Sequence, residues 1–393
     1  MAGSKRPLPE MKKQRAVRLA FILAAAVVLA GAYIFHIRHD MTDFGVCYQG
    51  GQRVVQGETL YREADGHLQF KYSPAAALFF APLALLPYEA AKAVWYILEL
   101  ALLAGIFVLS WRMLPAAAKK ATPVFVWTFL IELKFLAREL ELGQVNLLIL
   151  FLLTLTLFSL FRQNELTAGL LWGCSLFFKP YALVFLPYFL LKKKFQTLSA
   201  GIAVSVAGLA LPAFFYGFKA NFAVLREWPA TLSKSTSGLL ASYDNASLYG
   251  FLLKAFPAFS RGLSGALFLT LFLGLAAVVL WLMRAGRKSP SIQNPEVLES
   301  ACLLILIPLF SPLGWNYNYL YSLLAVMLIL SAWRHFPQAG KIILVVNFVV
   351  MSTSLVEVWG RQLFHFYTHH ALVVVNLFFV LSALVYLRAK KTF

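Results

Sequence analysis

Five charged residues stand in one apolar stretch, residues 122–141, and charge inside an apolar span is costly enough to suggest function. They are Glu132, Lys134, Arg138, Glu139 and Glu141. At about 100° per residue, Lys134, Arg138 and Glu141 share one helix face, and the other two glutamates lie nearly opposite. Two interpretations follow: ion pairs to the preceding helix, at Lys92 or Glu99, or an aqueous cavity lined by Lys134 and Arg138.

A single lysine, Lys179, precedes Pro180 between the short apolar stretches 166–178 and 181–191. An ammonium group at membrane depth is costly, and non-helical backbone there is tolerated only where it lines a cavity. Position alone therefore makes Lys179 a candidate binding residue.

Two carboxylates, Asp40 and Asp43, follow the first apolar stretch. A carboxylate that is partly dehydrated beside apolar surface can keep enough basicity to act as a general base. Alternatively, both are solvated, or Asp43 caps a short helix that starts at Phe44. The pair His369-His370 is predicted to be interfacial rather than catalytic.

The composition places these groups in a membrane protein. Of 393 residues, 60% are hydrophobic and 13% are charged, whereas soluble domains have about 25% charged residues. There is no phosphate-binding glycine motif and no metal-ligand spacing, and the scattered Cys47, Cys174 and Cys302 are interpreted as packing thiols. A soluble protein is excluded, nucleotide chemistry is disfavoured, and we expect neither a cofactor nor a metal.

Basic residues at alternate connections predict the orientation of the chain in a membrane. Twelve apolar stretches are predicted to span, near residues 17–36, 88–112, 122–141, 145–161, 166–178, 181–191, 197–217, 263–283, 297–311, 317–333, 342–358 and 371–387. Most of the basic residues that give the net charge of +18 lie in the connections near Lys119, Lys193 and Arg287 and at both termini. No basic patch is therefore left to bind nucleic acid. We expect a multi-pass protein of a cell membrane, with both termini cytoplasmic.

The same rule decides between one helix and two over residues 166–191. A single span would place Lys192 to Lys194 and every later basic connection outside, so a short hairpin is predicted, with Lys179 at its tip. The apolar run from Leu19 to Phe35 is long for a signal peptide, which favours an anchor over a cleaved leader. Residues 1–393 are thus predicted to form one integral membrane domain.

Two long outer loops, about 36–73 and 218–261, remain between the spans. In the first loop, apolar residues from Phe44 to Val55 recur at near-helical spacing before Gly57, which predicts a short interfacial helix. Residues 74–87, interrupted by three prolines, are predicted to form a re-entrant or interface-lying segment.

Short motifs in a fixed order resemble the signatures of glycosyltransferase family 87. They are Asp43-Phe44, Tyr48, Gly57 to Tyr61, Tyr72-Ser73-Pro74 through Ala81-Pro82-Leu83, Gly143-Gln144-Val145-Asn146, Phe178-Lys179-Pro180-Tyr181, Asn245-Ala246-Ser247-Leu248 and Ser311-Pro312-Leu313-Gly314-Trp315. The resemblance covers roughly residues 40–330. It implies an all-α, polytopic GT-C-type bundle of about twelve transmembrane helices, whose long outer loops carry short interfacial helices.

The resemblance also implies an activity: transfer of a sugar, usually mannose, from a polyprenyl-phosphate donor to an envelope glycolipid or glycan on the extracytoplasmic face. The essential aspartate of the family's first outer loop corresponds to Asp43, and the lysine of its Lys-Pro motif corresponds to Lys179. Family members often have a histidine soon after the tryptophan of the S-P-x-x-W motif, whereas Trp315 is followed here by Asn316 and Tyr317. This departure leaves the acceptor and the donor sugar open.

Transfer from a lipid phosphate needs a base for the acceptor hydroxyl, cations for the departing phosphate and an apolar entry for the prenyl chain. Asp43 is the predicted base, and Lys179, with Lys134 or Arg138, the predicted phosphate ligand. The predicted substrate cavity is lined by Asp40, Tyr72, Gln144, Asn146, Asn245, Trp315 and Tyr317. Direct displacement with one carboxylate inverts the anomeric centre.

A transporter or a flippase for lipid-linked sugars stays open as an alternative, because it too has many spans and intramembrane charges. No repeat relates the two halves of the sequence, and the long outer loops fit an outward-facing enzyme better. Asn245-Ala246-Ser247 is formally a glycosylation sequon, and we interpret it as a loop motif.

Overall fold

The computed structural model describes residues 23–115, 123–286 and 295–390, and within these ranges the chain is helical, without β-strand. The longer helices match the predicted apolar stretches in position. They are α4 (Tyr88–Met113), α5 (Pro123–Leu142), α6 (Asn146–Phe161), α7 (Glu165–Leu176), α9 (Phe195–Ala210), α13 (Arg261–Gly286), α14 (Pro295–Phe310), α15 (Leu323–Ser331), α16 (Gln338–Thr353) and α18 (Val373–Ala389). The predicted all-α fold is confirmed.

The number of membrane spans is not confirmed. Three helical segments are long and apolar enough to cross a bilayer: α4, Phe195–Tyr216 and the greater part of α13. A fourth is α16 taken together with α17 (Val356–His369), although the two are bent by 99°. Shorter apolar helices, α6 and α18 among them, contain 10–17 residues, fewer than the roughly 20 that span a bilayer, and α5 has five charged residues.

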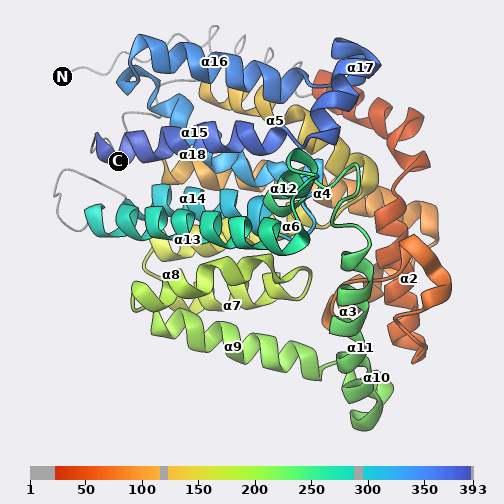
Figure 1. The fold of residues 1–393 in the computed structure, drawn as a ribbon. Helices are drawn as coiled ribbons and strands as arrows, with labels where there is room; N and C mark the ends of the chain where they lie inside the picture. The colour runs from red at the N-terminus through yellow and green to blue at the C-terminus, as the bar shows by residue number, and fades with distance from the viewer. Residues whose placement is uncertain (1–22, 116–122, 287–294, 391–393) are drawn as a thin grey trace, which may run out of the picture.

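Four other helices lie at one end of the bundle, as Figure 1 shows for α2 (Thr42–Gln56), α10 (Ala213–Tyr216), α11 (Phe218–Ser237) and α17. Helix α2 belongs to the predicted outer loop 36–73 and α11 to the loop 218–261, whereas α10 lies at the end of the predicted span 197–217 and α17 follows the bend after α16. Helices α5, α13, α14, α15, α16 and α18 run side by side away from this end. The loops that the sequence singles out therefore meet at one end of the molecule. They are joined there by two short helices, α3 (Pro74–Ala84) and α12 (Leu248–Ala255).

Helix α2 lies where apolar spacing predicts a helix. Its residues Phe44, Cys47 and Val54 are buried, and Gly57 ends it in the left-handed conformation, with φ 66°. Its first residue follows Met41, and no side chain caps this end. The interpretation of Asp43 as a helix cap is therefore wrong.

Helix α3 begins at Pro74, within the segment predicted to be broken by proline. Ser73 accepts a hydrogen bond from the Ala76 N–H at 3.3 Å and caps the helix, while Pro82 lies inside it. A Cβ atom on Gly51 of α2 would lie 2.8 Å from the Phe80 carbonyl carbon. Only glycine fits this close crossing of α2 and α3.

The chain reverses direction at Lys179. After α7 come η4 (Pro180–Phe185) and α8 (Leu186–Leu191), and the Trp172 indole N–H donates to the Ala182 carbonyl at 2.8 Å. The Trp172 and Phe189 rings pack edge to face at 5.3 Å. The Lys-Pro sequence thus forms the turn between two antiparallel segments.

Two of the basic residues attributed to loops are paired inside the protein. Lys192 lies 2.7 Å and Arg388 3.0 Å from the buried Glu299 carboxylate. Other basic residues used for the orientation argument, including the N-terminal run, Lys119, Lys120, Arg287, Lys288 and Lys391, lie outside the described residues.

Candidate active site

The turn between α5 and α6 packs against the start of α2. The Met41 N–H donates to the Glu141 carbonyl at 2.9 Å, and Gly143 has φ 63°. A Cβ on Gly143 would lie 2.7 Å from Phe44 Cβ, so this turn requires glycine both for its backbone conformation and for its close approach. The next residue, Gln144, is thereby placed beside Asp43.

Gln144 is the centre of a polar network that joins three regions of the chain. Its Nε2 donates to Asp43 Oδ2 at 2.7 Å and to the Tyr317 hydroxyl at 3.2 Å. Its Oε1 accepts from Lys179 Nζ at 3.4 Å and from the Tyr72 hydroxyl at 3.4 Å. One nearly buried amide therefore has the carboxylate on one side and the ammonium on the other.

Lys179 precedes η4 in an extended conformation and points into this network. Its Nζ donates to Asn146 Oδ1 at 2.9 Å and lies 5.5–6.0 Å from the ring centres of Tyr72, Tyr181 and Tyr317. Among the described residues, no carboxylate lies within ion-pair distance of Nζ. A half-buried ammonium without a counter-ion favours binding of an anion.

Tyr72 belongs to the first outer loop and reaches the network from the Tyr72-Ser73-Pro74 motif. The Ser73 N–H donates to the Phe177 carbonyl at 3.2 Å, which fixes this motif beside the Lys179 turn. Burial is the largest cause that raises the pKa of the Tyr72 hydroxyl. Tyr72 therefore stays protonated and donates to Gln144.

Sequence reasoning missed two residues of the site. Glu139 is fully buried and accepts hydrogen bonds from Asn146 Nδ2 and the Leu147 N–H, both at 2.9 Å. It therefore stabilises the turn that contains Gln144 and Asn146. Tyr181 is the ring nearest to Lys179 Nζ. Two features of the sequence could have identified them: Glu139 lies on the second polar face of α5, and Tyr181 belongs to the Lys-Pro motif.

Lys134 and Arg138 lie outside the network. Lys134 Nζ donates to Ser354 Oγ at 2.5 Å, and Arg138 Nη1 donates to Glu141 at 2.6 Å. Both line a cavity of about 870 Å³ together with Trp315 and Tyr317.

The interpretation that the charged residues of α5 form ion pairs with Lys92 or Glu99 of the preceding helix is wrong. Lys92 binds Glu89 at 2.6 Å, and neither Glu99 oxygen has a hydrogen-bond partner within the described ranges.

Asn245 lies just before α12 and supports the loop that follows α14. Its Nδ2 donates to the Pro312 carbonyl at 3.1 Å, and its Oδ1 accepts from the Gly314 N–H at 2.9 Å. The side chain is fully buried, so it holds the Trp315 loop and does not line the cavity. Burial also speaks against Asn245 as a glycosylation site.

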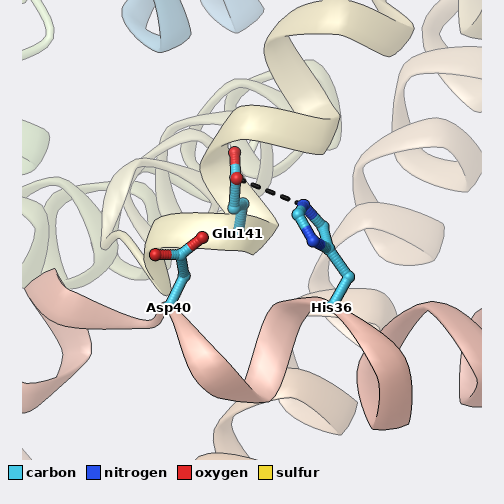
Figure 2. A group of neighbouring side chains, drawn as sticks. All are labelled: His36, Asp40 and Glu141. Carbon is cyan, nitrogen blue, oxygen red and sulfur yellow. Dashed lines mark ion pairs between the residues drawn. The ribbon is translucent and has the colours of Figure 1, made fainter.

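Asp40 belongs to a surface group with His36 and Glu141, which Figure 2 shows. Their potential ligand atoms lie within 4.8 Å of one another, and His36 Nε2 is 3.3 Å from Glu141 Oε1. The sequence search for metal-ligand spacing missed this trio because Glu141 is distant in the chain. The His36–Glu141 contact accounts for the cluster, and both His36 and Asp40 are exposed.

An apolar groove of about 860 Å³ begins next to Lys179. It is lined by Pro180 and Tyr181 at one end and by side chains of α8, α13 and α14, among them Leu190, Leu280 and Ile307. Tyr181 lines this groove and Tyr317 lines the cavity of Lys134 and Arg138, and both rings lie within 6 Å of Lys179 Nζ.

Gln144 joins the Asp43 carboxylate to Lys179, which has no carboxylate within ion-pair distance among the described residues, and an apolar groove lies beside them. Groups of these kinds are what transfer of a sugar from a lipid-linked phosphate requires. The chain belongs to glycosyltransferase family 87, whose family model matches residues 70–312. It is a membrane glycosyltransferase.

Relatives support this assignment. The chain is 24% identical over 371 residues, 85% of this chain and 82% of the relative, to a polyprenol-phosphate-mannose-dependent alpha-(1-2)-phosphatidylinositol mannoside mannosyltransferase of Mycobacterium tuberculosis. It is 27% identical over 314 residues, 72% of this chain and 68% of the relative, to the mannosyltransferase of the same description from Mycolicibacterium smegmatis.

A third relative differs in the sugar that its name gives. It is an alpha-(1->3)-arabinofuranosyltransferase of Corynebacterium glutamicum, 28% identical over 199 residues, which is 48% of this chain and 46% of the relative. No solved structure matches the chain significantly.

Proposed function

We propose that the protein transfers mannose from a polyprenyl-phosphate donor to a hydroxyl group of an envelope lipid or glycan on the extracytoplasmic face. The observation that carries this proposal is the Gln144 amide, which has Asp43 at 2.7 Å and Lys179 at 3.4 Å on its two ends. A base and a phosphate ligand are thus held a short distance apart by one rigid group.

In the proposed reaction, the acceptor oxygen attacks the anomeric carbon as the bond from that carbon to the phosphate oxygen breaks. Asp43 takes the proton of the acceptor hydroxyl. The electron pair of the broken bond goes to the phosphate, whose added charge Lys179 stabilises. A single displacement inverts the anomeric centre, so a β-linked donor gives an α-linked product.

The apolar groove that starts at Pro180 and Tyr181 is the proposed path of the donor's prenyl chain. A chain in this groove leaves its phosphate beside Lys179, which lies next to these residues in sequence and 5.5 Å from the Tyr181 ring. Lysine serves phosphate as a compact point charge, and no metal is required to bind a monophosphate leaving group in this scheme.

Product analysis tests the assignment. The purified protein in detergent is offered polyprenyl phosphates bearing mannose, arabinofuranose or glucose, with extracted envelope lipids as acceptors. We expect a new α-mannosyl bond, detected by mass spectrometry and glycosidase digestion. A transporter or flippase forms no new bond in detergent, so the absence of product from every donor would reject the enzyme assignment.

We also propose the orientation of the chain. The outer loops, represented by Asp43, Ser235 and His369, face outward, and the connections near Lys119, Lys193 and Arg287 face the cytoplasm with both termini. The gathering of α2, α11 and α17 at one end of the bundle supports this orientation.

Single cysteines introduced at these six positions in a cysteine-free background are expected to separate into two groups. An impermeant maleimide added to intact cells should label residues 43, 235 and 369 and should reach 119, 193 and 287 only after permeabilisation. Labelling of residue 193 from outside would contradict the orientation.

A further inference from the structure

Lys179 is linked to two carboxylates, each through one amide side chain. Its Nζ donates to Gln144 Oε1 at 3.4 Å and to Asn146 Oδ1 at 2.9 Å. On the far side of the first amide, Gln144 Nε2 donates to Asp43 Oδ2 at 2.7 Å. On the far side of the second, Asn146 Nδ2 donates to Glu139 Oε2 at 2.9 Å. One ammonium therefore has two links of the same kind, one to the proposed base and one to Glu139.

The two carboxylates differ in burial. Glu139 is 0% exposed, and both of its oxygens accept hydrogen bonds, Oε2 from Asn146 and Oε1 from the Leu147 N–H at 2.9 Å. A charge is tolerated in a protein interior only when it is paired and hydrogen-bonded in this way. Asp43 is partly exposed, as a base that meets an acceptor must be. Glu139 is therefore a fixed charge that no substrate can reach.

The chemistry of donors and acceptors fixes the orientation of the Asn146 amide. An ammonium can only donate hydrogen bonds and an ionised carboxylate can only accept them. An amide between the two must turn its oxygen toward Lys179 and its nitrogen toward Glu139, as the structure shows. Without the carboxylate, the amide could turn over and present its N–H groups to the ammonium. Glu139 thus determines which group of Asn146 faces Lys179.

The link through Asn146 also keeps the carboxylate at a distance from the ammonium. Within the residues that the structure describes, Lys179 Nζ has no direct ion pair. A carboxylate in direct contact would compete with a phosphate for the same N–H groups. Placed one side chain away, Glu139 holds the ammonium without occupying it.

We infer that Glu139 is a positioning residue for the donor: through Asn146, it holds Lys179 where the ammonium can bind the donor phosphate. This inference rests on the proposed function and deepens it by giving the two links different tasks. When Asp43 takes the proton of the acceptor hydroxyl, its carboxyl group becomes neutral and accepts a weaker hydrogen bond from Gln144. The buried link to Glu139 takes no part in this proton transfer, so it keeps Lys179 beside the departing phosphate.

Glu139 also has a structural contact that must be separated from this role. Its Oε1 accepts from the Leu147 N–H in the first turn of α6, and a carboxylate at a helix N-terminus stabilises the helix. That contact does not involve Asn146. Its loss affects the stability of the whole protein, whereas loss of the link to Lys179 affects only the binding of phosphate.

Two ligands of the detergent-solubilised, full-length protein make this separation: a polyprenyl phosphate, and the polyprenol that has the same chain without phosphate. We expect Glu139→Gln to weaken binding of the phosphate about tenfold, the size of one charge-assisted hydrogen bond, and to leave binding of the polyprenol unchanged. Glu132→Gln is the matched control. Glu132 is equally buried on α5 but accepts from Ser322 Oγ at 2.7 Å, outside this network, so we expect its variant to bind both ligands as wild type does.

A double-mutant cycle tests whether Glu139 acts through Asn146. Asn146→Leu removes the shared amide and should itself weaken phosphate binding about tenfold. The combination Glu139→Gln/Asn146→Leu should bind the phosphate no more weakly than Asn146→Leu alone, because the link is already broken. Losses that multiply in the double variant would contradict the inference.

A third variant exchanges the two groups. In Glu139→Gln/Asn146→Asp, the same hydrogen bonds can form and the net charge is unchanged, but the carboxylate now contacts Lys179 directly. We expect thermal stability close to that of wild type and phosphate binding at least about tenfold weaker, because the new ion pair competes with the ligand. This variant decides the matter even if Glu139→Gln does not fold.

Normal phosphate binding by the exchanged variant would overturn the inference, and so would an equal loss of polyprenol binding in Glu139→Gln. Lys179→Met is measured alongside as the reference. If Lys179→Met weakens phosphate binding and the Glu139 variants do not, only the role of Glu139 is wrong. If Lys179→Met also binds the phosphate normally, the donor site of the proposed function is wrong as well.

Discussion

Asp43→Asn is expected to reduce sugar transfer by about 10²–10⁴-fold, the usual loss when a general base is removed. Asparagine keeps the size of the side chain, and its amide oxygen can still accept the hydrogen bond that Gln144 Nε2 gives to Asp43 Oδ2 at 2.7 Å. The variant should therefore keep its thermal stability and its affinity for the donor. Initial rates of product formation, measured alongside thermal unfolding and donor binding, check this expectation.

Asp40→Asn is the matched control. Asp40 lies three residues away on the exposed surface, beside His36 and Glu141 and outside the Gln144 network. We expect its rate to stay close to that of wild type. Substantial transfer by Asp43→Asn, or loss confined to Asp40→Asn, would rule out Asp43 as the base. Loss of folded Asp43→Asn protein would instead assign Asp43 a structural role.

Lys179→Met is expected to weaken donor binding about 10- to 100-fold, because the substitution removes one charge-assisted contact to phosphate. Methionine keeps most of the length and lies well among the rings of Tyr72, Tyr181 and Tyr317. Titration of the detergent-solubilised protein with a polyprenyl phosphate, which has the phosphate but no sugar, isolates this contact from catalysis.

Lys134→Met provides the comparison for donor binding, because Lys134 lies in the other cavity and contacts Ser354. We expect its affinity for polyprenyl phosphate to equal that of wild type. If folded Lys179→Met binds and turns over the donor normally while Lys134→Met does not, the two lysines exchange roles, and the groove beside Tyr181 is no longer the donor path.

The local pattern of the sequence determined most of the elements. Apolar runs placed α4, α6 and α18 to within a few residues, and the near-helical spacing from Phe44 to Val55 with Gly57 at its end placed α2. These predictions succeed because burial of an apolar face and termination by glycine depend on neighbours in the chain. The motifs also named Asp43, Gln144 and Lys179, because the resemblance carries over residue by residue.

Only the tertiary structure decided which of these residues meet. Gln144 is 101 residues from Asp43 and 173 from Tyr317, yet it bonds both. Lys134, grouped with Lys179 by charge alone, faces a separate cavity, and Asn245 supports a loop from inside the protein. The predicted number of spans is not confirmed, and apolar length does not show where a helix breaks, as at Ser354 between α16 and α17. Periodicity is local, whereas a side-chain hydrogen bond between distant segments depends on how whole helices pack and on the direction in which each side chain leaves its backbone.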